Sequence, residues 1–72
     1  MIQRFHFDLT DGKATLPDKA GVLAGDLREA IEEAHEALRE MRASEELDEF
    51  GDGWKLVIRD ESGGVRKVFW VW

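Results

Sequence analysis

Glu32 and His35 are the pair of residues in this 72-residue chain whose types and spacing come nearest to a catalytic or metal site. A Glu followed three positions later by a His on a helix is the spacing of half a di-metal carboxylate site. Such a site needs further Glu ligands from facing helices, and the sequence predicts only one long helix. We therefore expect no metal site, and we interpret His35 as a solvated residue beside the apolar stripe of that helix.

The remaining polar residues do not predict catalysis either. Ser44 and Ser62 lie in cap or turn settings, and neither histidine has a sequence context that identifies it as a partner base. The stretch 48–53 departs from the calcium-loop pattern, and Gly63-Gly64 precedes no helix that would bind phosphate. So short a chain also leaves little room for a pocket of ordinary volume. We expect a protein that is not an enzyme and uses no cofactor.

The helix that carries His35 also has a polar side rich in acids, and this side is the candidate binding site for a protein partner. Its acidic residues are Glu29, Glu32, Glu33, Glu36 and Glu40. Side chains three and four positions apart on a helix lie about 5–6 Å from one another, so these carboxylates form one negative patch. Two interpretations stay open. The patch binds a basic protein, in the extreme by imitating the phosphate backbone of a nucleic acid, or it is an ordinary solvated face.

The net charge of −6 is unevenly distributed along the chain. Residues 26–52 hold eleven acids and three bases, a net charge of −8, and the remainder has a net charge of +2. A nucleic-acid-binding protein is expected to show a basic patch, and here the concentrated charge has the opposite sign. We expect no direct binding to DNA or RNA.

Length and composition predict one domain over residues 1–72, with no Cys for a disulfide or a zinc site. A core of this size supplies only about 3–5 kcal/mol of net stability, so self-association as a homodimer is the default expectation. No apolar run approaches the roughly 18 residues that suggest a membrane span, and no basic segment with a following apolar run opens the chain. We expect a cytoplasmic protein.

One amphipathic helix over residues 26–42 organises the predicted fold. Its apolar positions follow a period of three and four residues: Leu27, Ala30, Ile31, Ala34, Leu38 and Met41. Asp26 is placed to cap the first turn. After Met41, Ser44 either caps a second short helical turn with Leu47 and Phe50 facing inward, or the main helix continues.

Strands are predicted on both sides of the helix. Residues 1–9, 13–16, 54–60 and 65–72 show alternating or β-rich patterns, and Asp11-Gly12 suits a tight hairpin turn. Pro17 stops the second strand and places it at an edge of the sheet. Val22 and Leu23 are expected to anchor a linker. These elements predict an α+β fold in which a four-stranded antiparallel sheet of order 2-1-3-4 packs one face on the helix.

The last predicted strand departs from simple alternation, because both of its faces are apolar. A single helix covers only one of them, and leaving aromatic side chains in water is unfavourable. We expect the open sheet face or the edge of this strand to form the homodimer interface, through Val57, Phe69, Trp70, Val71 and Trp72. In the alternative interpretation the end of the chain folds back onto its own domain.

The order of these features also resembles a known protein family. Arg4-Phe5-His6-Phe7 precedes Asp11-Gly12, Asp18 and Gly21, and Asp26-Leu27 opens an Ala- and Glu-rich helix. Gly53-Trp54 and Asp60-Glu61 then precede a Val-rich final strand. This arrangement is similar to a family of short bacterial proteins catalogued only as a domain of unknown function. The resemblance implies an α+β fold and no established activity, and the ending Phe69-Trp70-Val71-Trp72 departs from the usual pattern.

A second resemblance covers residues 15–41. Leu16-Pro17-Asp18, Gly21-Val22 and the helix from Asp26 to Leu38 look like the strand-to-helix passage of HicB-type antitoxins. This likeness implies a small α+β domain that covers a partner toxin. Antitoxins of this kind often add a DNA-binding segment, and the sequence contains none.

Overall fold

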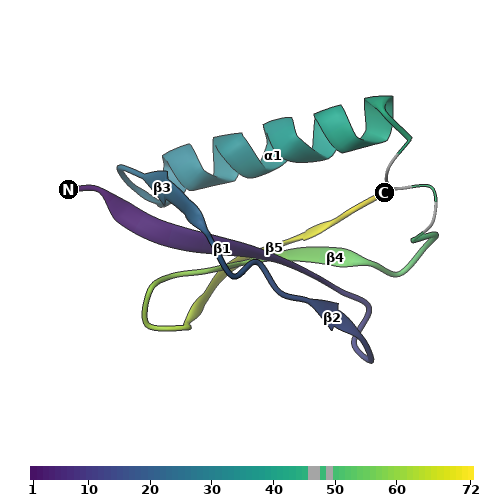
Figure 1. Ribbon diagram of the computed structural model, residues 1–72, viewed down its shortest axis with the longest axis horizontal. Coiled ribbons are helices and arrows are strands. Elements are labelled where there is room, and N and C mark those ends of the chain that lie inside the picture. Colours follow the sequence, from purple (N-terminus) through teal and green to yellow (C-terminus); the bar gives the residue numbers. More distant parts are fainter. Residues whose placement is uncertain (46–47, 49) are drawn as a thin grey trace.

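The computed structural model describes residues 1–45, 48 and 50–72, and it consists of one helix packed along one face of an antiparallel sheet (Figure 1). In chain order the elements are β1 (Gln3–Thr10), β2 (Thr15–Leu16), β3 (Val22–Ala24), α1 (Leu27–Ala43), β4 (Lys55–Arg59) and β5 (Val65–Trp70). The α+β class expected from the sequence is confirmed. No helix among the described residues is long and apolar enough to cross a membrane.

The sheet has the order β2-β1-β4-β5, and every pair of neighbours is antiparallel. The four predicted strands therefore lie in the predicted order. The predicted number of strands is wrong by one, because Val22–Ala24 forms β3 rather than a linker. This short strand pairs with β1 at Gln3, Arg4 and Phe5, on the same side of β1 that β2 uses near Thr10. A run of three residues is too short for its pairing to be visible in an alternation pattern.

The helix begins where the sequence predicts. The Asp26 carboxylate accepts a hydrogen bond from the Glu29 backbone N–H at 2.8 Å and so satisfies one free donor of the first turn. The helix ends at Ala43, Ser44 is its C-cap, and Glu45 adopts a positive φ of 65°. The main helix therefore does not extend to Ser44 and Glu45, as the continued helix would require. The alternative, a second helical turn that includes Leu47, falls in part outside the described residues.

The core lies between α1 and the sheet. Ala30, Ala34 and Leu38 face it from the helix, and the small alanines let the helix backbone approach the strands closely. The sheet and the end of the chain contribute the other fully buried apolar residues, Phe5, Ala24, Leu56, Ile58 and Val71. Burial of a large apolar side chain stabilises a fold by about 1.5–3 kcal/mol, so these few side chains dominate the stability of so small a chain.

Candidate interaction surfaces

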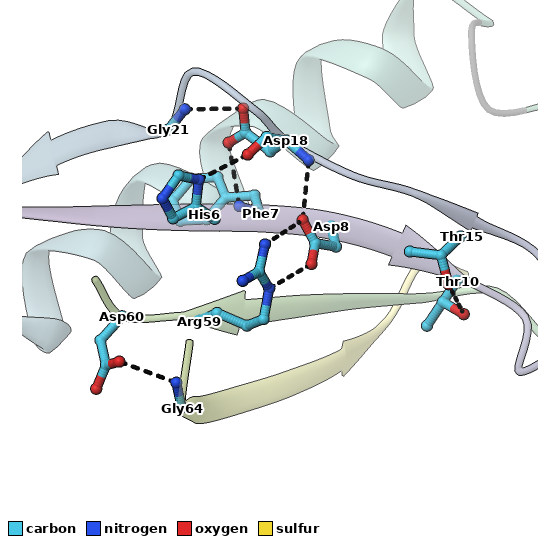
Figure 2. Close-up of polar contacts among 10 residues, drawn as sticks. All are labelled: His6, Phe7, Asp8, Thr10, Thr15, Asp18, Gly21, Arg59, Asp60 and Gly64. Carbon is cyan, nitrogen blue, oxygen red and sulfur yellow. Dashed lines mark hydrogen bonds and ion pairs between the residues drawn. The ribbon is translucent and has the colours of Figure 1, made fainter. Parts of the chain in front are cut away.

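Residues 17–21, which we call the Asp18 arch, fill the gap that β2 and β3 leave along β1 (Figure 2). The Asp18 carboxylate accepts hydrogen bonds from the Phe7 N–H at 3.1 Å and from the Gly21 N–H at 3.0 Å. The Asp18 carbonyl lies 2.6 Å from His6 Nδ1. Because a carbonyl oxygen only accepts, Nδ1 is the protonated nitrogen of this ring. In the middle of this edge, the Asp18 side chain therefore satisfies a backbone N–H group of β1 that a neighbouring strand would otherwise satisfy.

Asp8 joins the Asp18 arch to the next strand. Its side chain is nearly buried and accepts the Asp18 backbone N–H at 2.9 Å. Two nitrogens of the Arg59 guanidinium donate to the same carboxylate, at 2.5 and 3.3 Å (Figure 2). The hydrogen bonds from Arg59 are the main reason why the pKa of Asp8 is lowered, against the opposing effect of burial. The same pairing raises the pKa of Arg59. Asp8 is thus held ionised by the hydrogen bonds from Arg59 and from the Asp18 backbone.

Gly21 is the position in the Asp18 arch that only glycine fits. Its φ is +76°, and a Cβ there would lie 2.9 Å from the Phe5 carbonyl oxygen and 2.8 Å from Arg4 Cγ. Any side chain would push the arch away from β1. The combination of Asp18 and Gly21 therefore has a structural purpose, which is to close this edge of the sheet.

The opposite edge of the sheet is built differently. Four large apolar side chains are exposed on β5 and just after it, and we call them the β5 surface: Val65, Val68, Trp70 and Trp72, which are 45–61 % exposed. Val57 lies opposite Val68 on β4 and is half-buried. The Lys55 ammonium sits 4.7 Å from the centre of the Trp70 ring. In the part of the chain that the structure describes, no strand pairs with the outer edge of β5.

Two residues predicted for self-association lie on the other side of β5. Val71 is fully buried, so its expected place in an exposed interface is wrong. Its carbonyl accepts hydrogen bonds from the Arg42 guanidinium at 3.0 and 2.5 Å, and the same guanidinium lies 5.9 Å from the Trp72 ring centre. Phe69 is half-buried, with its ring 4.4 Å from that of His35. The end of the chain is therefore docked on the helix through one face, while Trp70 and Trp72 stay exposed.

The loop between β4 and β5 fixes where β5 starts. The Asp60 carboxylate accepts hydrogen bonds from the Ser62 hydroxyl at 2.6 Å, and from the N–H groups of Ser62 and Gly64, both at 3.0 Å. These bonds hold the pKa of Asp60 below its usual value, and the bond from the Ser62 hydroxyl contributes most. Arg66 at the start of β5 lies 3.4 Å from the same carboxylate.

The acidic helix face is present as predicted, with all five carboxylates exposed: Glu29, Glu32, Glu33, Glu36 and Glu40. Together with Ala37 they line a shallow depression of about 480 Å³. All six lining residues belong to α1, so the depression lies along one helix and has no second wall. Arg28 forms an exposed ion pair with Glu32 at 2.7 Å. The surface is a negative patch rather than a pocket.

His35 is turned away from the acidic helix face, towards the ring of Phe69. Among the described residues there is no group of three or more His, Asp or Glu side chains placed to hold a metal ion. The spacing of Glu32 and His35 therefore does not correspond to a ligand set in this part of the structure.

The arrangement that sequence reasoning missed is centred on Asp8, which accepts hydrogen bonds from the Asp18 backbone N–H and from the Arg59 guanidinium. Strand alternation correctly places Asp8 on the face of β1 opposite the core, where a solvated carboxylate is the ordinary expectation. It is buried because the Asp18 arch folds over it. Asp18 and Gly21 are among the residues that carry the family resemblance, but their partner on β1 has no signature in a single sequence.

A family model described as "Domain of unknown function (DUF6894)" matches residues 4–68. The match includes the Asp18 arch, the helix and β4, and it ends at Val68, before Trp70 and Trp72. No curated protein and no solved structure gave a significant match to this chain. The likeness to HicB-type antitoxins gains no support from these comparisons.

Proposed function

The chain belongs to the DUF6894 family, whose description assigns no activity, and we propose from its surfaces that it is a non-catalytic protein-interaction module that works as a homodimer. The proposal rests on the β5 surface. Four large apolar side chains, two of them tryptophans, are exposed beside an unpaired strand edge of the described sheet. Apolar side chains grouped at one place on a small protein are typical of an interaction site.

The chemistry of the polar residues supports a role without catalysis. Among the described residues, the carboxylates whose pKa is shifted belong to Asp8, Asp11 and Asp60, and hydrogen bonds from nearby backbone and side-chain donors lower each of these pKa values. These carboxylates are already used to hold turns and strands in place. A catalytic acid or base is usually tuned towards neutral pH, and none of these groups is.

The experiment that tests the proposal is sedimentation equilibrium over a range of protein concentrations. We expect a reversible dimer, and we expect Trp70→Ala to raise its dissociation constant about tenfold or more, because an aromatic anchor is removed from the interface. Leu23→Ala is the matched control, since Leu23 is 54 % exposed on β3, at the far side of the sheet. A monomer at all concentrations, or equal effects of the two variants, contradicts the homodimer.

A second candidate function uses the acidic helix face as the site for a basic protein. The exposed and adjacent carboxylates of α1 are the observation that favours it. Attraction between exposed charges weakens as salt screens them. Binding of a basic partner should therefore fall with rising salt and should be lost when Glu32, Glu33 and Glu36 are changed to Gln. Unchanged binding by that triple variant would contradict this candidate.

A further inference from the structure

The free edge of β5 offers the backbone groups of alternate residues. The Val71 N–H donates to the Trp54 carbonyl at 3.0 Å, so the backbone groups of Val71 point towards the β4 side. In an antiparallel ladder the direction of the backbone N–H and C=O groups alternates from one residue to the next, so those of Phe69 also point towards β4. The N–H and C=O groups of Val68 and Trp70 then point outward, to the side that no described strand occupies.

A second copy of β5 can satisfy these outward groups only in certain registers. Two identical antiparallel strands are related by a two-fold axis. A residue whose backbone groups point outward must face another such residue, and these residues alternate along the strand. The axis must therefore lie between two copies of the same residue. An axis at Lys67 places the two Lys67 side chains opposite one another, which is unfavourable for like charges. An axis at Phe69 leaves much of the first half of β5 unpaired.

An axis at Val68 gives a different set of neighbours. Lys67 then lies opposite Phe69 of the other copy, so that this cation meets an aromatic ring. Arg66 lies at the β-bulge of this strand, 3.4 Å from the Asp60 carboxylate, and the register does not depend on it. Within one copy, Lys67 Nζ already lies 5.9 Å from the Phe69 ring centre. The strand is thus self-complementary about Val68, with Lys67 before it and Phe69 after it.

We propose that two copies of this chain join by antiparallel pairing of β5 with β5 about a two-fold axis at Val68, which extends the sheet across both copies. The inference rests on the homodimer of the proposed function and specifies its geometry. Strands paired in this way keep their faces, so both helices lie on one face of the joined sheet. Trp70 of each copy lies on the opposite face, near the start of β5 of the other copy. The acidic helix face of each copy remains exposed.

Cross-linking through single cysteines tests the register, because the chain has no Cys of its own. Val68→Cys places two Cα atoms about 5.5 Å apart across the axis, within the usual range for a disulfide. In the same register, two cysteines at Lys67→Cys or at Phe69→Cys are about 8 Å apart, beyond that range. We therefore expect Val68→Cys to form the covalent dimer about tenfold faster than either neighbour under the same mild oxidant.

The outcomes separate the register from the dimer itself. Fastest cross-linking at Lys67→Cys or Phe69→Cys, with a dimeric mass for the unmodified chain, overturns the axis at Val68 and leaves the homodimer standing. A monomeric mass with slow and equal cross-linking at all three positions overturns both. The reduced form of each variant is checked by circular dichroism, and Lys67→Cys, on an exposed residue, is the variant least able to disturb the fold.

Discussion

The two edges of the sheet contrast in how their backbone groups are treated. On the β1 side, two short strands and the Asp18 arch cover the edge, and Pro17 removes a donor from its exposed border. On the β5 side, a strand of six residues presents outward N–H and C=O groups beside exposed valines and tryptophans. The same chain therefore closes one edge with several devices and leaves the other available.

This difference indicates where the chain forms contacts with other proteins. Short edge strands, prolines and covering loops are the usual means by which proteins prevent unwanted strand pairing. A charged edge residue is another such means, and Lys67 is the candidate on β5. Its ammonium lies over the Phe69 ring, and in the proposed dimer it meets an aromatic residue rather than a like charge. The contrast can be tested by altering each edge separately.

The largest expected effect on stability comes from opening the closed edge with Asp18→Ala. The substitution removes an ionised acceptor from the N–H groups of Phe7 and Gly21. Hydrogen bonds to charged groups are worth about 1.5–3 kcal/mol, and we expect a loss of that size in the free energy of unfolding. Urea denaturation followed by tryptophan fluorescence measures it. Lys19→Ala, at the exposed neighbouring position, is the control, and an equal loss in both variants contradicts the role of the arch.

The second test is the pH dependence of stability at the same edge. The pKa of Asp8 is lowered in the folded state, chiefly by Arg59, so the unfolded chain takes up this proton first as the pH falls. The stabilisation is complete above the ordinary Asp pKa of about 3.9 and is lost as the pH falls through the lower, folded-state value. Asp11 and Asp60 have lowered pKa values and act in the same direction.

Asp8→Ala isolates the contribution of this one carboxylate. It leaves the Asp18 N–H without its acceptor, and we expect it to cost about 1–3 kcal/mol at neutral pH. The difference from the wild type should shrink between pH 5 and pH 2, a range set by the ordinary pKa of Asp. A difference that stays constant over this range would contradict the assignment of an ionised Asp8. Thermal unfolding at a series of pH values provides the measurement.

The smallest expected effect concerns α1, which belongs to neither edge. Glu36→Lys removes the repulsion between residue 36 and two like-charged neighbours, Glu32 and Glu40, which lie four positions away on either side. We expect a stabilisation of about 0.5 kcal/mol from the relief of repulsion and the new attractions. The association constant should change little, because the acidic helix face lies outside the proposed interface. Loss of the dimer in this variant would move the interface to the helix.

The sequence was sufficient for the features that depend on periodicity and on single-residue chemistry. The period of α1, the cap at Asp26 and the position of Pro17 predicted the helix, its start and the order of the main strands. β3 was missed because three residues carry no periodic signal. Val71 is predicted at the surface but is buried, because the fold brings it into the core with residues distant in the chain such as Leu38.

The candidate surfaces divide in the same way. The exposed carboxylates of α1 and the exposed Trp70 and Trp72 follow from local patterns, and they were predicted. The hydrogen bonds that Asp8 accepts from the Asp18 backbone and from Arg59 join residues 10 and 51 positions apart in the chain. These hydrogen bonds depend on which segment of the chain lies along β1. Residue spacing in the sequence does not indicate that segment.

The most direct test of the open β5 edge is the solution mass of the wild type and of Val68→Lys, measured by light scattering on a size-exclusion column at low and high salt. We expect the wild type to be a dimer that is retained or strengthened at high salt, because salt screens the repulsion between two copies that each carry a net charge of −6. We expect Val68→Lys, which places two like charges at the axis, to be a monomer with an unchanged fold. A monomeric wild type at every concentration, or a Val68→Lys variant that remains fully dimeric, would contradict the account.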